Sequence, residues 1–262
     1  MIAADLALAL DPVLLARRAG LDPDPWQAEL LRSTSKQMIL LCSRQAGKST
    51  VSSFLALHEA LYHPPALVLL LSPSLRQSQE LFRKVKDGLR SAGADAHPIE
   101  EESALRVEFS NGSRIVSLPG KEATVRGYSG VALLIEDEAS RVPDPLYQAV
   151  RPMLAVSGGR IVLLSTPFGK RGHFFEVWEN GGPSWQRVKI TAQACPRISP
   201  EWLEAERAAI GDWWYRQEYG CEFVEAVDQV FDYASVMGAL DASIVPLFGG
   251  EGSELCLTSL EV

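Results

Sequence analysis

The chain has 262 residues, of which 47% are hydrophobic, enough to bury one sizeable core with a small appendage. The formal net charge of −8 has the wrong sign for a protein that coats nucleic acid with its whole surface, so any contact with DNA must be local. The four cysteines, Cys42, Cys195, Cys221 and Cys256, form no C-x-x-C pair, which argues against a zinc site or a disulfide framework.

The first 35 residues predict short helices separated by Asp-Pro turns, as in "DPVLLARRAGLDPDPWQAELLRS". No basic region precedes an apolar one at the N-terminus, and the apolar runs are far shorter than the ~20 residues of a membrane span. We therefore expect neither export nor a membrane.

From residue 36 onward the chain alternates apolar β-type runs with helical patterns. "QMILLC" precedes a helix over 48–61, and "ALVLLLS" precedes one over 74–90. The apolar runs "VALLIEDEAS", "GGRIVLLSTP" and "SWQRVKI" follow. Continuous apolar strands between helices predict the α/β class: a mostly parallel sheet with helices on both faces.

One stretch departs from this alternation. In "LRVEFSNGSRIVSL", two alternating runs flank Asn111-Gly112, which predicts a β-hairpin insertion or edge.

The helix over 74–90 carries several cations and is the candidate DNA contact, although a solvated helix face explains them equally well. These cations are Arg76, Arg83, Lys84, Lys86 and Arg90.

Two helical stretches, "SPEWLEAERAAI" and "DWWYRQEYG", bring the α/β unit to about residue 225. The remainder has weak periodicity and a Gly-Gly-Glu-Gly break. We therefore divide the chain into a helical preface (1–35), a core (36–225), and a linker with a short tail (226–262).

The stretch "LLCSRQAGKSTVSSFL" comes close to the phosphate-binding pattern G-x-x-x-x-G-K-[ST], with Cys42 at the first position. A strand that ends in a loop before a helix offers free amides and a positive helix end to phosphate. Lys48 can reach the β- and γ-phosphates and Ser49 can ligate Mg²⁺, whereas the alternative is a surface turn. The residues expected to bind nucleotide here are Ser43, Arg44, Gln45, Ala46, Gly47, Lys48, Ser49 and Thr50.

A second element supports this interpretation. "VALLIEDEAS" delivers acidic residues at the carboxyl end of a strand, where open α/β sheets bind ligands. We expect Asp137 to hold Mg²⁺ and Glu138 to polarise the attacking water, while Glu136 points to the other side of the strand. The alternative is an acidic N-cap region for the next helix.

In order and spacing, "SRQAGKS", "DEAS" and "LLSTPFGKRG" resemble the large-subunit terminases of tailed bacteriophages, over residues 24 to 232. In that family the first loop position is not reliably glycine, which accommodates Cys42. The resemblance implies a RecA/ASCE-like P-loop NTPase that uses ATP and Mg²⁺. Hydrolysis would drive double-stranded viral DNA into a procapsid.

The resemblance also implies roles for single residues. Gln27 is similar to the adenine-reading glutamine, although a plain helix-surface glutamine is an alternative. Ser165 and Thr166 are similar to the coupling motif that senses the γ-phosphate, or they close a strand with a Thr-Pro turn. Arg44 would neutralise phosphate charge. Arg126 is similar to an arginine finger offered to a neighbouring subunit, or else is a surface arginine or a partner for Glu122.

The partners implied by the resemblance are double-stranded DNA, a portal protein, a small terminase subunit and further copies of the chain in a ring. The implied location is the host cytoplasm, transiently at the portal vertex of the procapsid. Full-length terminase large subunits also contain a nuclease domain, and Asp228, Asp232 and Asp241 cannot be matched to it in a chain of this length. We therefore expect an ATPase without nuclease activity.

Two other functions remain open at this stage. A fragment of a DEAD-like helicase or translocase would share the P-loop and the acidic motif, but it needs a second RecA-like lobe, and no second set of strand and helix signals follows residue 225. A non-enzymatic nucleotide-binding prophage remnant would have no need for the water-activating carboxylate of Glu138.

Overall fold

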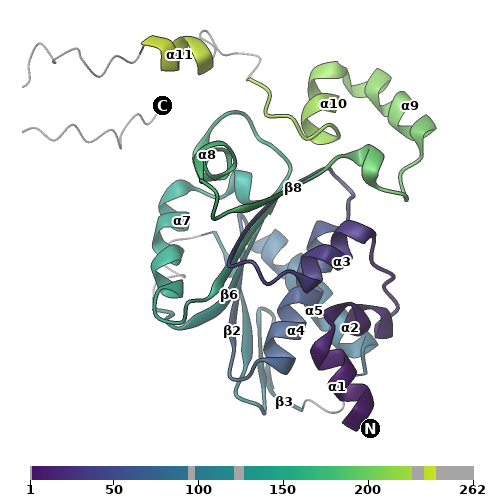
Figure 1. Ribbon diagram of the computed structural model, residues 1–262, viewed down its shortest axis with the longest axis vertical. Coiled ribbons are helices and arrows are strands. Elements are labelled where there is room, and N and C mark those ends of the chain that lie inside the picture. The colour runs from purple at the N-terminus through teal and green to yellow at the C-terminus, as the bar shows by residue number, and fades with distance from the viewer. Residues whose placement is uncertain (1, 94–97, 121–126, 226–232, 240–262) are drawn as a thin grey trace, which may run out of the picture. The chain divides into compact units, whose positions relative to one another are not determined.

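The computed structural model of the chain describes residues 2–93, 98–120, 127–225 and 233–239 (Figure 1). Its contacts divide it into two compact units, Met1–Val224 and Glu225–Val262. In the second unit the described secondary structure is one short helix, α11 (Tyr233–Ala239). All of the elements described below belong to the first unit.

The first unit contains an eight-stranded sheet in the order β3-β4-β5-β2-β6-β7-β1-β8. From β5 to β8 every neighbouring pair is parallel, whereas β4 runs antiparallel to both β3 and β5. The strands are β1 (Gln37–Cys42), β2 (Leu67–Ser72), β3 (Ile99–Glu102), β4 (Arg106–Phe109), β5 (Arg114–Pro119), β6 (Val131–Asp137), β7 (Arg160–Ser165) and β8 (Gln186–Ile190). The predicted mostly parallel sheet is confirmed.

Side chains alternate between the two faces of this sheet, and each face has its own core. Leu40 packs in the cluster that includes Phe54 and Phe82 of helices α4 (Lys48–Tyr62) and α5 (Leu75–Ser91). Its neighbour Leu41 packs in the cluster that includes Phe174. Burial on both faces explains why these strands read as continuous apolar runs.

Figure 1 shows the helices on the two faces of the sheet, with α1 to α5 on one side and α7 and α8 on the other. The remaining helices of the unit are α1 (Ile2–Leu10), α2 (Pro12–Arg18), α3 (Pro25–Arg32), α7 (Asp144–Val150), α8 (Gly172–Asn180), α9 (Pro200–Ile210) and α10 (Asp212–Glu218). Short 3₁₀ helices follow three of the strands or helices: η1 (Ala139–Arg141), η2 (Arg151–Leu154) and η3 (Ala192–Ala194).

The predicted hairpin lies between β4 and β5, where Arg106 pairs with Val116 and Glu108 with Arg114. Gly112 has φ 81°, the left-handed conformation that this turn requires. The side chain of Asn111 accepts a hydrogen bond from the Ser113 amide at 2.9 Å and donates one to the Ala60 carbonyl at 2.9 Å. The turn is therefore fixed to the end of α4 as well as to itself.

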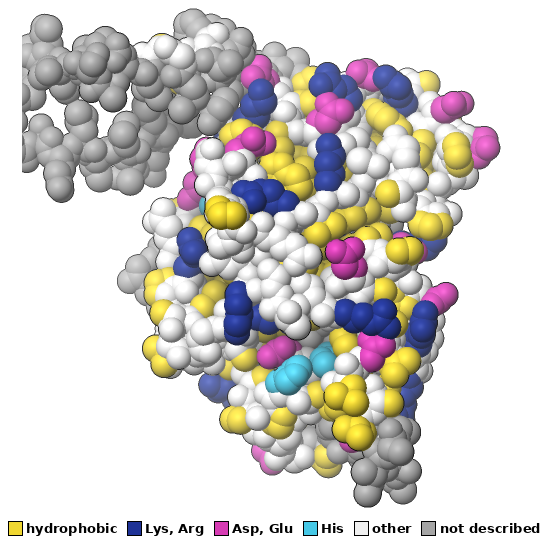
Figure 2. All heavy atoms as spheres, viewed as in Figure 1, with side chains coloured by type: hydrophobic (Ala, Val, Ile, Leu, Met, Phe, Trp, Pro, Cys, Tyr) yellow, Lys and Arg dark blue, Asp and Glu magenta, His cyan; other side chains and the backbone are white. Residues whose placement is uncertain are grey.

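Three of the five basic side chains of α5, Arg83, Lys86 and Arg90, pair with acidic side chains. Arg83 pairs with Glu80, and Lys86 lies 3.3 Å from Glu102 on β3. On the face drawn in Figure 2, Lys and Arg side chains are interspersed with Asp and Glu. The DNA contact expected of α5 stays a prediction. Among the described residues, no helix is both long enough and apolar enough to cross a bilayer.

Candidate active site

The P-loop lies between β1 and α4, at the carboxyl edge of the sheet. Two of its residues, Gln45 (φ 60°) and Gly47 (φ 88°), adopt left-handed backbone conformations. The φ of Gly47 favours glycine, and a Cβ atom there would lie 2.7 Å from Nε2 of Gln27, so a side chain would also displace that amide. The amides of Gly47, Lys48 and Ser49 come at the start of α4, where helical N–H groups have no intrahelical acceptor.

The first loop residues are held by other parts of the chain. The Ser43 amide donates to the Ile190 carbonyl at 2.8 Å, and the Arg44 amide donates to the Glu218 carbonyl at 3.0 Å. The guanidinium of Arg44 pairs with the Glu218 carboxylate at 2.8 Å. Arg44 thus lies at the loop, as expected, but its charge is engaged by α10.

Lys48 and Glu138 form an ion pair in which Nζ lies 3.0 Å from Oε1. Burial lowers the pKa of Lys48, but the carboxylates of Glu138 and Asp137 outweigh burial and raise this pKa above its ordinary value. Lys48 therefore keeps its charge although its side chain is only 9% exposed. A buried, charged lysine at the start of a helix is equipped to bind phosphate oxygens.

Ser49 and Asp137 provide a pair of oxygen ligands next to this lysine. The Ser49 hydroxyl donates to Oδ2 of Asp137 at 2.8 Å. Oδ1 of Asp137 is buried and has no hydrogen-bond partner among the described residues. Burial, followed by the charge of Glu138, raises the pKa of Asp137. A buried carboxylate oxygen without a partner, beside a hydroxyl, fits the oxygen ligands that Mg²⁺ prefers.

Glu138 adopts a left-handed backbone conformation, with φ 56° and ψ 42°, immediately after the strand. A residue other than glycine rarely takes this conformation, and such strain persists where the surrounding structure enforces it. The turn separates the two acidic side chains, so that Asp137 faces Ser49 while Glu138 faces Lys48.

Ser165 and Thr166, at the end of β7, lie against the turn that follows Glu138. The hydroxyls of Ser140 and Ser165 are 2.7 Å apart, and Ser140 also donates to the Thr166 carbonyl at 2.9 Å. Thr166 Oγ1 accepts a hydrogen bond from Arg141 at 3.2 Å. Both predicted coupling residues are buried and connected to the acidic turn.

Gln27 is buried, and both polar atoms of its side-chain amide form hydrogen bonds with backbone groups of the chain. Oε1 accepts a hydrogen bond from the Asp24 amide at 2.9 Å, and Nε2 donates to the Ala46 carbonyl at 3.3 Å. Arg197 donates to the same carbonyl at 3.0 Å and pairs with Asp24 at 2.6 Å. The structure therefore places Gln27 as a contact of the P-loop backbone, and adenine reading stays a prediction.

A groove of about 380 Å³ opens beside this contact. It is lined by Gln45, Arg197, Ile198, Ser199 and Trp202. The side chain of Trp202 is 45% exposed, and apolar and aromatic walls with a few polar groups are typical of sites for small organic ligands. The groove offers room for a nucleoside next to the phosphate loop.

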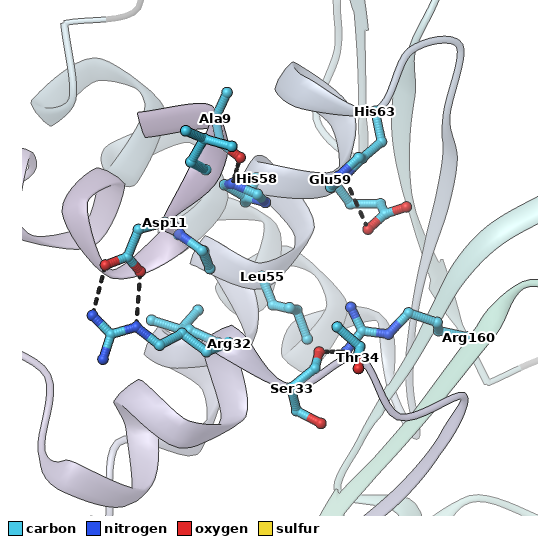
Figure 3. Close-up of a pocket in the computed structure, with 13 residues that line it drawn as sticks. Ala9, Asp11, Arg32, Ser33, Thr34, Leu55, His58, Glu59, His63 and Arg160 are labelled. Carbon is cyan, nitrogen blue, oxygen red and sulfur yellow. Dashed lines mark hydrogen bonds and ion pairs between the residues drawn. The ribbon is translucent and has the colours of Figure 1, made fainter. Parts of the chain in front are cut away.

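A larger pocket, of about 460 Å³, lies near the other end of α4 (Figure 3). Its charged side chains contact one another: Arg32 pairs with Asp11 at 2.6 Å and His63 with Glu59 at 3.5 Å. Arg160, at the start of β7, donates to the Ser33 carbonyl at 2.8 Å. Residue 59 follows residue 48 by three helical turns, about 16 Å, so this pocket is separate from the P-loop.

Comparison with known proteins identifies the family. A family model described as the N-terminal part of the terminase large subunit, T4likevirus type, matches residues 39–236. The chain belongs to this terminase family. It is 28% identical over 247 residues to the terminase large subunit of Thermus virus P23-45, covering 81% of this chain and 51% of that protein. It is 26% identical over 203 residues to that of Escherichia phage T5, covering 72% and 44%.

This terminase chain thus spans about half the length of the curated relatives it matches. Two solved structures show the same fold. The ATPase domain of the Thermus phage P74-26 large terminase has a TM-score of 0.71 at 24% identity, covering 80% of this chain and 97% of that one. The large terminase of another thermophilic bacteriophage, in complex with ADP, has a TM-score of 0.66 at 15% identity, covering 77% and 54%.

Sequence analysis missed two charged residues of the terminase site. Glu218, on α10, is buried and pairs with Arg44 and with Arg141, the latter at 3.7 Å. Arg141 follows the acidic motif directly, and its spacing of three from Glu138 is the signal that could have revealed it. Nothing in the sequence joins Glu218 to the P-loop. Arg126 lies outside the described residues.

Glu136 points away from the P-loop, to the other face of the sheet. Its carboxylate pairs with Nε2 of His173 on α8 at 2.9 Å, and Nδ1 of His173 lies 3.0 Å from Asp144. The ring of Tyr147 stacks on His173 with centroids 4.2 Å apart. Burial lowers the pKa of His173, but the two carboxylates outweigh burial and raise this pKa.

Proposed function

We propose that this terminase chain binds ATP with Mg²⁺ and hydrolyses it, and that in the assembled motor the hydrolysis drives double-stranded viral DNA into a procapsid. The observation that carries the proposal is the meeting of Lys48, Ser49, Asp137 and Glu138 at one edge of the sheet, through contacts of 3.0 and 2.8 Å. The large terminase of the thermophilic bacteriophage compared above was solved with ADP and with ATP-gamma-S, which supports nucleotide binding by this fold.

Each residue has a distinct task in this proposal. The amides that start α4 and the ammonium of Lys48 bind the β- and γ-phosphates. Ser49 and Asp137 hold Mg²⁺, which when bound would neutralise charge on the phosphate oxygens. The nucleoside lies in the groove beside Gln45. Thr166, near Glu138, serves to sense the γ-phosphate.

Hydrolysis then requires one proton transfer by the protein. The oxygen of water bonds to the γ-phosphorus while the bond from this phosphorus to the β–γ bridging oxygen breaks. Glu138 accepts the proton that the water loses. The carboxylate is suited to this because the left-handed turn at Glu138 directs it to the phosphate side of the sheet edge, next to Lys48.

Family membership favours the packaging ATPase over the helicase fragment and the non-enzymatic remnant. A phosphate-release assay with Mg²⁺ and ATP, with and without double-stranded DNA, tests the choice. The parent chain should turn over, and Lys48→Ala should abolish turnover and weaken ATP binding. Lys189→Ala removes an exposed lysine on β8 and should keep the parent rate. Near-parent turnover by Lys48→Ala would contradict the P-loop assignment.

The partners proposed for the whole terminase are the portal protein, the small terminase subunit and further copies of this chain in a ring, at the procapsid in the host cytoplasm. Arg126 would act across the ring interface as an arginine finger. If so, ATPase activity per subunit should rise with protein concentration or on assembly at a portal. Constant specific activity under both conditions would contradict this role of Arg126, because it would show that one chain contains the complete ATPase site.

We also propose that the chain itself does not cut DNA. Among the described residues, no group of three or more His, Cys, Asp or Glu side chains is placed to hold a metal ion. Supercoiled plasmid incubated with the pure chain and Mg²⁺ or Mn²⁺ should stay supercoiled. Nicking that needs the metal and copurifies with the chain would contradict this.

A further inference from the structure

Arg141 lies in contact with the proposed catalytic carboxylate. It ends η1, the 3₁₀ turn that begins after Glu138, and its amide donates to the Glu138 carbonyl at 2.9 Å. Nη1 of its guanidinium lies 3.6 Å from Oε2 of Glu138. Glu138 therefore has two cations, because Lys48 contacts its other oxygen at 3.0 Å.

The guanidinium of Arg141 is fixed by residues from two other segments, the loop after β7 and helix α10. Its Nη1 donates to the Thr166 hydroxyl, just after β7, at 3.2 Å. Its Nη2 lies 3.7 Å from the buried carboxylate of Glu218 on α10. The Cζ atom of the group lies over the Phe168 ring, 4.5 Å from its centroid. A side chain held by a hydrogen bond, an ion pair and a cation–π contact has little freedom to turn away.

The two cations at Glu138 have different tasks when ATP is bound. Lys48 then has phosphate oxygens to bind, as a P-loop lysine does. Arg141 is not required to bind phosphate oxygens, because its other partners are Thr166, Glu218 and Phe168. It can therefore keep the carboxylate of Glu138 in place while Lys48 serves the nucleotide.

We propose that Arg141 is a positioning residue for Glu138, an inference that rests on the proposed ATPase function. Its guanidinium holds the Glu138 carboxylate in the orientation that accepts a proton from water. The same nitrogen, Nη1, contacts the Glu138 carboxylate and donates a hydrogen bond to the Thr166 hydroxyl. Arg141 acts on the reaction through Glu138 and not by contact with the phosphates.

Arg141→Gln tests this, because it keeps most of the length of the side chain and removes its charge. A misplaced catalytic group loses up to about 100-fold in rate, so we expect kcat to fall by about 10- to 100-fold. The Kd for ATP, measured without turnover, should stay within about twofold of the parent value, because Lys48 and the loop amides are intact. Arg141→Lys keeps the positive charge but lacks the planar guanidinium, and its kcat should lie between that of the parent chain and that of Arg141→Gln.

Two comparisons separate this role from packing. Arg171→Ala removes the other guanidinium over Phe168, 4.9 Å from the ring centroid, and should keep the parent kcat. In a Glu138→Gln background, Arg141→Gln should lower kcat no further, because residues that act as a unit are not additive.

Several results would overturn the proposal. An unchanged kcat in Arg141→Gln would do so, and so would a weakened ATP Kd, which would make Arg141 a phosphate ligand. A further loss in the Glu138→Gln background would show action independent of Glu138. A lowered Tm in both Arg141→Gln and Arg141→Lys would make the residue structural. If the parent chain itself shows no ATP turnover, the proposed function fails instead.

Discussion

Lys48 Nζ lies 3.0 Å from Oε1 of Glu138, which joins the first residue of α4 to the residue that follows β6. The two elements are distant in sequence but adjacent in space, because the ends of parallel strands meet at one edge of the sheet. The cation proposed to bind phosphate and the carboxylate proposed to activate water are thus in direct contact.

Asp137→Asn should raise the Mg²⁺ concentration needed for half-maximal ATPase activity. The substitution removes the charge of the buried carboxylate that Ser49 contacts at 2.8 Å, and an amide is a weaker ligand for a hard cation. A Mg²⁺ titration at saturating ATP measures the shift. Glu136→Gln changes the adjacent carboxylate on the opposite face and should leave the Mg²⁺ requirement unchanged. Equal shifts in both variants would contradict a metal-specific role for Asp137.

Gln27→Ala should weaken the binding of ATP and GTP by similar factors. The substitution leaves the Ala46 carbonyl with one donor fewer and removes the acceptor for the Asp24 amide, which loosens the P-loop. Loss of these buried contacts should also lower the free energy of unfolding by about 1–3 kcal/mol. Glu29→Ala, at an exposed position of α3, should change it by less than about 0.5 kcal/mol.

The comparison of ATP with GTP decides between two roles for Gln27. A glutamine that reads adenine would lose selectivity for ATP when it is replaced. Loss of selectivity without loss of stability would therefore favour base reading over the P-loop contact.

The pair of Glu136 and His173 predicts how stability changes with pH. Burial lowers the pKa of His173, but its two carboxylates outweigh burial and raise this pKa above its ordinary value of 6.5. A group whose pKa is higher in the folded state stabilises the fold below its unfolded pKa and loses that effect as pH rises. The free energy of unfolding should therefore decrease from pH 6.5 upward, as denaturant titrations between pH 6 and 9 would show.

The double variant Glu136→Gln/His173→Gln supplies the control, because it removes both titrating groups while keeping side chains that can form a hydrogen bond. Its stability should vary less with pH over the same interval. A decrease as steep as that of the parent chain would assign the pH dependence to other groups.

Much of the fold could be predicted because its signals are local. The apolar runs at 37–42 and 67–72 lie in strands buried on both faces, and Asn111-Gly112 forms the turn of the hairpin. The short helix α7 gave no clear pattern, because its seven residues are too few to establish a helical period. Helix α11 lies in the segment that was expected to be a linker and tail.

The site was predictable where a recognisable loop or an acidic motif comes at the end of a strand. Ser49 and Asp137 meet because both lie at carboxyl ends of the parallel sheet. The contacts of Arg44 with Glu218 and of Gln27 with the Ala46 carbonyl join segments that are far apart in the sequence, and no short pattern encodes such contacts. Glu136 faces away from the loop, as strand alternation predicts, whereas its partner His173 could not be foreseen.

The most direct test of the account is single-turnover hydrolysis of bound ATP by Glu138→Gln. The account predicts that this variant binds ATP with near-parent affinity, since Lys48 and the loop amides are unchanged. It should hydrolyse the bound nucleotide at least about 100-fold more slowly, the lower range for loss of a group that transfers a proton. Hydrolysis at near the parent rate with unchanged affinity would contradict the assignment of Glu138 as the group that activates water.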